Sequence, residues 1–319
     1  MPLIDIAKLL KGERRSLAKA ITLIESKLAS HREESQQILE SVLPLTGNSI
    51  RIGISGIPGV GKSTFIETFG LFLISLGKRV AVLAVDPSSP IAGGSILGDK
   101  TRMEKLSRSN DAFIRPSPSE GALGGVAHKT RETMLLCEAA GYDVILVETV
   151  GVGQSEYEVA SMVDFFMVLM LPNAGDELQG IKKGILELAD ALVVNKADGD
   201  SINMAQQTKR YYENALHLLS LRSIWSPKVM TCSAQEKMNI AEVWDLIFTF
   251  NAEAAKCGYL SSNRSLQNKN WMRKLLFEML ESKLMKNSDI KQQMPELEKK
   301  VVSSEITPYR AAKHIIDLL

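Results

Sequence analysis

The nine residues GIPGVGKST, which begin at Gly56, have the types and spacing of a phosphate-binding loop. They fit the pattern G-x-x-x-x-G-K-[ST], in which backbone N–H groups of a glycine-rich turn point at phosphate oxygens. A lysine at the start of the following helix can neutralise the terminal phosphates, and the serine hydroxyl after it can ligate Mg²⁺. The predicted phosphate-binding set is Gly56, Pro58, Gly59, Val60, Gly61, Lys62, Ser63 and Thr64.

A second motif indicates which base is bound. Asn195, Lys196 and Asp198 match the N-K-x-D motif of guanine-nucleotide-binding proteins. A carboxylate at Asp198 can accept hydrogen bonds from the N1–H and the exocyclic amine of guanine, whereas adenine would leave it unpaired. Ser233 and Ala234 end the next apolar run, where such proteins contact the guanine O6 through the backbone. We therefore predict GTP and GDP as the ligands.

Acidic residues at the ends of two apolar runs complete the expected chemistry. Asp86 ends RVAVLAVD, and Glu148 ends DVILVE shortly before Gly151. At the carboxyl edge of a parallel sheet such residues lie beside the phosphates, where they can bind Mg²⁺ directly or through its waters. Small GTPases usually place a glutamine right after the glycine, but this chain has Val152, with Gln154 two positions further on. This predicts slow intrinsic hydrolysis that a rearranged loop or a partner accelerates.

The scaffold for these residues is predicted from short, continuously apolar runs that alternate with amphipathic helices. The runs cover residues 50–55, 79–85, 143–148, 165–171, 191–195 and 228–233. Continuous apolar runs are typical of a parallel sheet covered on both faces, so the fold class is α/β, with a mostly parallel, doubly wound sheet. Helix is predicted over residues 4–43, and only helices follow residue 255. The expected domains are a helical extension (1–46), a P-loop GTPase domain (47–255) and a C-terminal helical dimerisation region (256–319).

Composition narrows the function classes. The 319 residues carry a formal net charge of +1, which gives no electrostatic case for nucleic acid binding. No apolar run approaches the roughly 18 residues that a membrane span needs, and the first residues lack the pattern of a secretory signal. Cys137, Cys232 and Cys257 are far apart, as expected in a reducing compartment. We expect a cytoplasmic protein without nucleic acid or membrane partners.

Longer stretches resemble one family closely, the MeaB/ArgK-type GTPases, which include the human cobalamin-A disease protein. They are residues 85–103, 113–132, 148–156 and 174–190. The family belongs to the SIMIBI class of P-loop proteins. The resemblance implies a homodimer that acts as a G-protein chaperone of an adenosylcobalamin-dependent acyl-CoA mutase, chiefly methylmalonyl-CoA mutase. The chaperone gates cofactor loading and protects the mutase. The resemblance also implies that the C-terminal helices form the dimer, with an apolar stripe around Trp271, Leu276 and Met279 as interface.

The resemblance also implies roles for individual residues. Lys62, Asp99 and Glu148 would be catalytic, with Asp86 and Asp99 near Mg²⁺ and the first switch loop. Glu148 and Gly151 fall in the second switch. The third switch, which changes contacts with the mutase, would contain Asp176, Glu177, Gln179 and Lys182. Without the resemblance, Gln179 and Lys182 would be interpreted as a solvated helix start.

Two other functions compete with this interpretation. A metallochaperone for nickel or another metal would need a His-rich tract or a Cys/His cluster, and the sequence has neither. A kinase or transport ATPase for basic amino acids would use ATP, against which the N-K-x-D motif argues. Within the leading hypothesis, methylmalonyl-, isobutyryl- and ethylmalonyl-CoA mutases all remain candidate clients.

Overall fold

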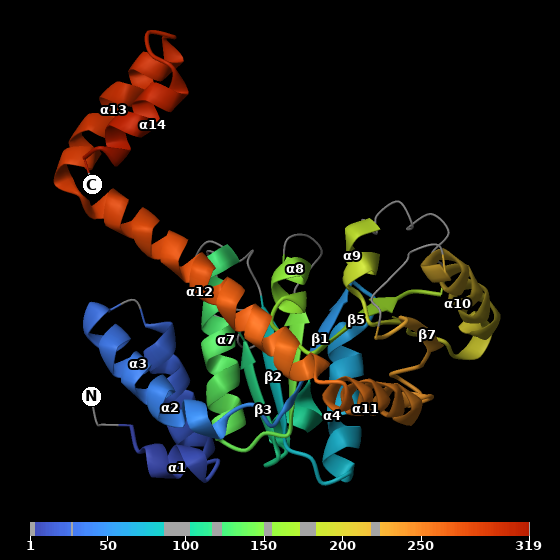
Figure 1. Ribbon diagram of the computed structural model, residues 1–319. Helices are drawn as coiled ribbons and strands as arrows, with labels where there is room; N and C mark the ends of the chain where they lie inside the picture. Colours follow the sequence, from blue (N-terminus) through green and yellow to red (C-terminus); the bar gives the residue numbers. More distant parts are fainter. Residues whose placement is uncertain are drawn as a thin grey trace. The chain divides into compact units, whose positions relative to one another are not determined.

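A seven-stranded parallel sheet is the centre of the structure (Figure 1). The computed structural model describes residues 4–26, 28–85, 103–116, 123–149, 155–172, 183–217 and 224–318. The strands are β1 (Ile50–Gly56), β2 (Val80–Val85), β3 (Ala112–Pro116), β4 (Val144–Thr149), β5 (Phe165–Met170), β6 (Ala191–Val194) and β7 (Lys228–Thr231). They are arranged in the order β3-β2-β4-β1-β5-β6-β7, and every neighbouring pair is parallel. The predicted α/β class with a doubly wound sheet is confirmed.

Six strands coincide with the apolar runs of the sequence, and β3 is the exception. β3 has five residues at one edge of the sheet, and Arg115 within it is only half-buried. An edge strand is hydrogen-bonded to a neighbouring strand on one side only. It can therefore be short and need not be a long apolar run. The run AFIRP therefore carries too little signal to be distinguished from a loop.

Helices cover both faces of the sheet. On one face α4 (Lys62–Ser75), α6 (Glu104–Arg108) and α11 (Ile240–Lys256) bury apolar side chains such as Phe65, Phe69 and Phe250. The helices of the other face are α7 (Leu123–Ala139), α8 (Ser155–Ala160), α9 (Lys183–Leu188) and α10 (Ile202–His217). The central strands are therefore buried on both sides, which explains why they are continuously apolar.

The N-terminal segment forms a third layer outside α7 (Figure 1). It is helical, but the predicted 4–43 stretch is broken into α1 (Ile6–Leu10), α2 (Arg14–Glu25) and α3 (Ala29–Val42), followed by the short η1 (Leu43–Leu45). Gly12 has φ +76°, and a Cβ there would lie 2.5 Å from the Arg79 guanidinium. The first of these two breaks, between α1 and α2, thus coincides with a left-handed turn at one glycine. The apolar periodicity continues across the break and does not reveal it.

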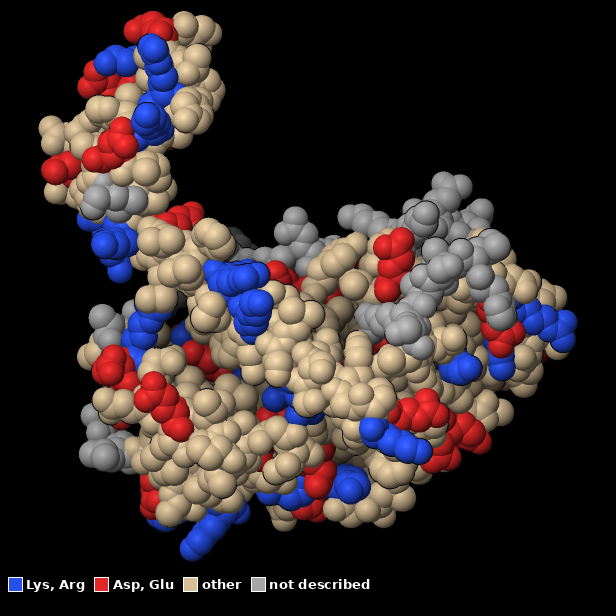
Figure 2. Space-filling view, in the orientation of Figure 1, with Lys and Arg blue, Asp and Glu red and all other residues tan. Residues whose placement is uncertain are grey.

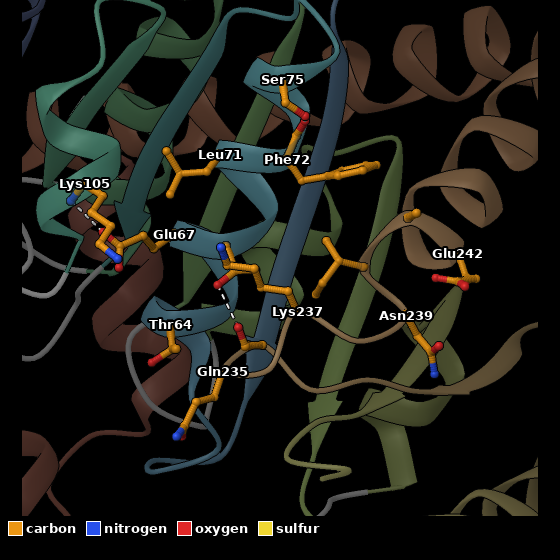
Figure 3. A pocket seen from close by; sticks show the side chains of 14 residues that line it. Thr64, Glu67, Leu71, Phe72, Ser75, Lys105, Gln235, Lys237, Asn239 and Glu242 are labelled. Atoms are coloured by element: carbon orange, nitrogen blue, oxygen red, sulfur yellow. Dashed lines mark hydrogen bonds between the residues drawn. The ribbon is translucent and has the colours of Figure 1, made fainter.

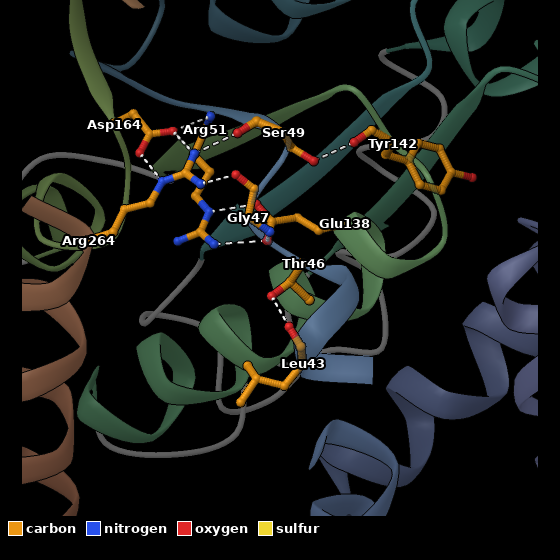
Figure 4. A network of polar contacts seen from close by, with 9 residues as sticks. All are labelled: Leu43, Thr46, Gly47, Ser49, Arg51, Glu138, Tyr142, Asp164 and Arg264. Carbon is orange, nitrogen blue, oxygen red and sulfur yellow. Dashed lines mark hydrogen bonds and ion pairs between the residues drawn. The ribbon is translucent and has the colours of Figure 1, made fainter. Parts of the chain in front are cut away.

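A buried network of charges fixes the amino end of β1 (Figure 4). The Arg51 guanidinium donates to both carboxylate oxygens of Glu138, at 2.8 and 2.9 Å. Asp164 accepts from the Arg51 backbone N–H at 2.9 Å and from Arg264 at 2.7 and 2.6 Å. Arg264 also donates to the carbonyls of Gly47 and Ser49. The network anchors the strand whose opposite end leads into the glycine-rich loop.

The chain divides into two compact units, Met1–Arg264 and Ser265–Leu319. α12 (Tyr259–Lys286) begins in the first unit and continues in the second, which also contains α13 (Ser288–Val302) and α14 (Pro308–Ile316). α13 and α14 pack together through Ile290, Ala311 and Ile315. The three-part division expected from the sequence stays a prediction.

Two properties of the structure bear on binding to nucleic acid and to membranes. On the face drawn in Figure 2, Lys and Arg side chains are interspersed with Asp and Glu, instead of forming a basic stripe. Within the described ranges, no helix combines the length and apolar content needed to cross a membrane.

Candidate nucleotide-binding site

The glycine-rich loop joins β1 to α4 and needs its glycines for stereochemical reasons. Gly56, Gly59 and Gly61 have φ values of +151°, +81° and +94°. A Cβ at Gly56 would lie 2.7 Å from the Leu169 carbonyl oxygen, and one at Gly61 would lie 2.9 Å from the Asn195 side-chain nitrogen. The loop therefore holds a conformation that other residues disfavour, and it ends at the amino terminus of α4, where free N–H groups and the helix dipole favour an anion.

Lys62 is the first residue of α4 and folds back over the loop. Its Nζ donates to the carbonyl of Gly56 at 2.7 Å and to that of Ile57 at 3.4 Å. Burial lowers the pKa of Lys62, while the negative charges of Glu148 and Glu156 oppose that shift. A phosphate group beside Nζ would supply the opposite charge that compensates for the desolvation.

The acidic side of the site comes from β4. Glu148 is buried near the end of this strand and is paired in register with Ile54 of β1. The next residue, Thr149, donates its hydroxyl to Ser55 at 2.9 Å, which ties the ends of the two central strands together. Ser63 lies in the first turn of α4 and is half-buried. Hydroxyl and carboxylate oxygens are ligands that suit Mg²⁺.

Asn195 connects the glycine-rich loop to the loop after β7. Its side-chain nitrogen donates to the Val60 carbonyl at 2.9 Å, and its oxygen accepts from the Ala234 N–H at 3.1 Å. Lys196, at φ +59°, donates its Nζ to the Gly59 carbonyl at 2.8 Å. The two sequence motifs, more than 130 residues apart, are therefore in direct contact.

Asp198 is half-buried and accepts a hydrogen bond from the Ser233 hydroxyl. Ser233 in turn accepts from the Glu236 N–H at 3.0 Å, which closes the turn after β7. The Cys232 thiol lies 3.5 Å from the Asn195 side-chain oxygen, and burial raises its pKa to about 12, so the thiol stays neutral. Asp198, Ser233 and Ala234 thus meet at one end of the site, as the sequence predicts for base recognition.

Helix α4 lies beside the turn after β7 and is hydrogen-bonded to it (Figure 3). The Thr68 hydroxyl donates to the Ala234 carbonyl at 2.8 Å, and the Asn239 side chain donates to the Thr231 carbonyl at 3.0 Å. A groove of about 640 Å³ runs between α4 and this turn; its lining includes Thr64, Leu71, Phe72, Gln235 and Lys237. The groove lies along the helix that carries Lys62 and beside the turn that carries Ala234.

Sequence reasoning missed three supporting residues. The Thr68 side chain contacts the Ala234 backbone, which is far away in the sequence. The Asn239 side chain contacts the Thr231 backbone, and Asn239 belongs to no recognised motif. Glu156 is fully buried in α8 and lies close enough for its charge to affect Lys62. Its only sequence signal is its position in the stretch ETVGVGQSE.

Seven predicted residues fall outside the part of the chain that the structure describes. They are Asp86, Asp99, Gly151, Asp176, Glu177, Gln179 and Lys182. Their predicted roles stay predictions. Within the described residues no group of three His, Cys, Asp or Glu side chains is arranged to hold a metal ion, and the oxygen donors brought to the loop are those of Ser63 and Glu148.

We expect Asp198→Asn to lower the preference for GTP over ATP by about ten- to a hundredfold, because a hydrogen bond to a charged group contributes roughly 1.5–3 kcal/mol. Competition binding with labelled GDP measures this ratio. Asp200→Asn, an exposed carboxylate two residues away, is the matched control and should leave the preference unchanged. An unchanged preference in Asp198→Asn would contradict the assignment of the base-recognising end.

Comparisons with known proteins find relatives over most of the chain. Residues 17–289 match the family described as "Methylmalonyl Co-A mutase-associated GTPase MeaB". The chain is 52% identical over 286 residues to GTPase ArgK of Escherichia coli K12, covering 89% of this chain and 86% of the relative. It is 49% identical over 315 residues to the mitochondrial methylmalonic aciduria type A homolog of Mus musculus, covering 95% and 76%.

A solved structure extends the likeness to three dimensions. The crystal structure of a protein named "LAO/AO transport system kinase" is similar with a TM-score of 0.79 and 42% sequence identity. The match covers 98% of this chain and 95% of that one. The likeness therefore extends over nearly the whole chain and is not limited to the sheet.

Proposed function

Because this chain belongs to the MeaB family of methylmalonyl-CoA mutase-associated GTPases, we propose that it is a G-protein chaperone of an adenosylcobalamin-dependent acyl-CoA mutase. As a member of this family it is a GTPase that binds guanine nucleotide. The proposed client is methylmalonyl-CoA mutase, and the proposed task is to assist cofactor loading and protect the mutase. The observation that carries the nucleotide part is the Asn195 side chain, which joins the glycine-rich loop to the turn beside Asp198.

In this proposal the loop between Gly56 and Lys62 holds the phosphates of GTP, and Asp198 with the backbone at Ala234 selects guanine. Lys62 exchanges its contact with the Gly56 carbonyl for the terminal phosphates. Ser63 and Glu148 would hold Mg²⁺, which supplies positive charge for the phosphoryl transfer when bound. The proposed catalytic set is Lys62, Asp99 and Glu148, with Asp86 and Asp99 as further metal ligands.

Partner control is the second part of the proposal. Intrinsic hydrolysis is slow because Val152 stands where small GTPases place glutamine, and the mutase accelerates it through the third switch. Support comes from the family's description as mutase-associated and from the relatives named after methylmalonic aciduria.

We also propose that the protein acts as a homodimer in the cytoplasm. The second unit exposes a row of large apolar side chains on α12: Met272, Leu276, Phe277, Met279 and Leu280. Exposed apolar patches of this kind often mark protein–protein interfaces. The three cysteines are free, which fits a reducing compartment.

The alternatives lead to different nucleotide and metal preferences. The solved structure similar to this chain bears the name of a kinase, and in the kinase alternative ATP would be the ligand. A metallochaperone would bind nickel or a comparable metal in a nucleotide-dependent way. Preference for ATP in competition binding, or stoichiometric nickel binding, would favour these alternatives over the mutase chaperone.

The decisive experiment measures GTP turnover of the purified protein with and without purified acyl-CoA mutases. We expect methylmalonyl-CoA mutase to accelerate turnover at least tenfold. Gln179→Ala and Lys182→Ala should keep basal turnover within about twofold and lose most of the stimulation, because these residues are proposed to contact only the mutase. Lys256→Ala, an exposed position at the end of α11, is the control. Equal loss of basal and stimulated turnover would place the two residues in catalysis instead, and no acceleration by any mutase would contradict the chaperone role.

A further inference from the structure

Residues of α2 and α3, together with Ile4, line an open surface pocket of about 400 Å³ in the N-terminal layer, which the proposed function does not use. One wall is a stripe of α2 that presents Arg15, Ala18, Lys19 and Thr22 at steps of three and four residues. The opposite wall is formed by His31 and Glu34 of α3. This volume lies in the range of small-molecule sites.

The interior of the pocket is apolar. Ile4, Ala18 and Leu23 contribute hydrocarbon, and the small side chain of Ala18 leaves the space open. The Thr22 hydroxyl donates to the Ala18 carbonyl at 2.9 Å and accepts from the Arg115 guanidinium at 3.4 Å, so it already has both a donor and an acceptor. An occupant would therefore meet mainly hydrocarbon along this wall.

The rim of the pocket is positively charged. Arg15 and Lys19 lie one turn apart, both line the opening, and neither forms an ion pair with any residue that the structure describes. Like charges four residues apart disfavour the helix that carries them, and an anion between them removes that cost. Among the described residues that line the pocket, Glu34 is the one carboxylate, so the two cations outnumber it.

We propose that this pocket binds a small aliphatic carboxylate. The hydrocarbon chain lies against Ile4, Ala18 and Leu23, and the carboxylate lies between the Arg15 guanidinium and the Lys19 ammonium. The His31 ring, whose Nδ1 is 2.8 Å from the Ser26 hydroxyl, forms part of the facing wall. This pocket contains no residue of the glycine-rich loop. A test of octanoate binding is therefore independent of the proposed partnership with the mutase.

The test is calorimetric titration of the full chain with octanoate. We expect saturable binding of one octanoate per chain, at least tenfold weaker binding of octylammonium, and at least tenfold weaker octanoate binding by the double variant Arg15→Gln/Lys19→Gln. Ala18→Trp fills the pocket and should abolish binding. Arg32→Gln, a cation on α3 outside the lining, is the matched control and should bind octanoate like the original chain.

Several outcomes would overturn the proposal. They are no saturable octanoate binding, equal binding of octylammonium, or undiminished binding by the double variant, which alters only exposed side chains. Binding by a folded Ala18→Trp variant would place the ligand elsewhere. Octanoate binding only after deletion of the first three residues would assign the pocket to the chain's own amino terminus, and loss of binding on self-association would assign it to a second copy.

Discussion

Lys62→Ala should weaken GTP binding by about a hundredfold or more, without destabilising the nucleotide-free protein. Losing one partner of a desolvated, hydrogen-bonded charge pair costs roughly 2–5 kcal/mol. Within the described residues, the hydrogen-bond partners of Lys62 in the nucleotide-free protein are the carbonyls of Gly56 and Ile57. Burial lowers the pKa of Lys62. A lowered lysine pKa means that folding disfavours the charged form, so removing the charge relieves a cost at neutral pH.

Two measurements separate binding from folding. Titration calorimetry gives the GTP affinity, and thermal unfolding without nucleotide gives the stability. Lys62→Met retains the alkyl chain and should match Lys62→Ala in affinity, which excludes a cavity as the cause. Lys256→Ala should match the original chain in both measurements. Unchanged GTP affinity in Lys62→Met would contradict the phosphate-binding role of the loop.

Arg264→Leu should lower the free energy of unfolding of the first unit by about 3–5 kcal/mol, because it leaves a buried carboxylate with too few partners. The Asp164 side chain is 1% exposed and receives two hydrogen bonds from the Arg264 guanidinium. Burial alone would lower the pKa of Arg264, but its hydrogen bond with Asp164 and the nearby negative charges outweigh that effect and raise it. Chemical denaturation followed by circular dichroism measures the loss.

A double-mutant comparison isolates this pair. Asp164→Leu combined with Arg264→Leu should be less destabilising than the sum of the two single changes, because the double variant leaves no unpaired charge. Additive losses would show that the pair is not coupled. The exposed Glu296–Lys300 pair is the control, and Lys300→Leu should give no measurable change, since solvent screens such pairs.

The N-terminal layer shows what apolar periodicity alone predicts correctly and what it misses. The apolar spacing of residues 4–43 predicts helix, and helix is found, but it is divided at Gly12 by a left-handed turn. The turn is closed by local hydrogen bonds from the Gly12 N–H to the Leu9 carbonyl and from the Glu13 N–H to the Lys8 carbonyl. The Arg79 guanidinium, from a segment 67 residues away, occupies the space beside Gly12. The end of the helix at Gly12 is therefore a property of one glycine and its surroundings, which the apolar periodicity does not record.

The sequence by itself determined the α/β class, six of the seven strands, and the two motifs that carry the proposed nucleotide chemistry. These features are recorded locally: a short, continuous apolar run between turns is typical of a buried strand, and a glycine-rich turn before a helix is typical of a phosphate site. The roles of Asp86, Asp99 and the third-switch residues stay predictions.

The tertiary structure alone decided which distant groups meet. It placed Asn195 between Val60 and Ala234, brought Glu156 near Lys62, and fixed the start of β1 through Arg264. It also put β3 at the sheet edge, where a short strand suffices. The physical reason is common to all of them: these contacts join residues far apart in the chain, and local periodicity carries no information about which side chains will approach one another in space.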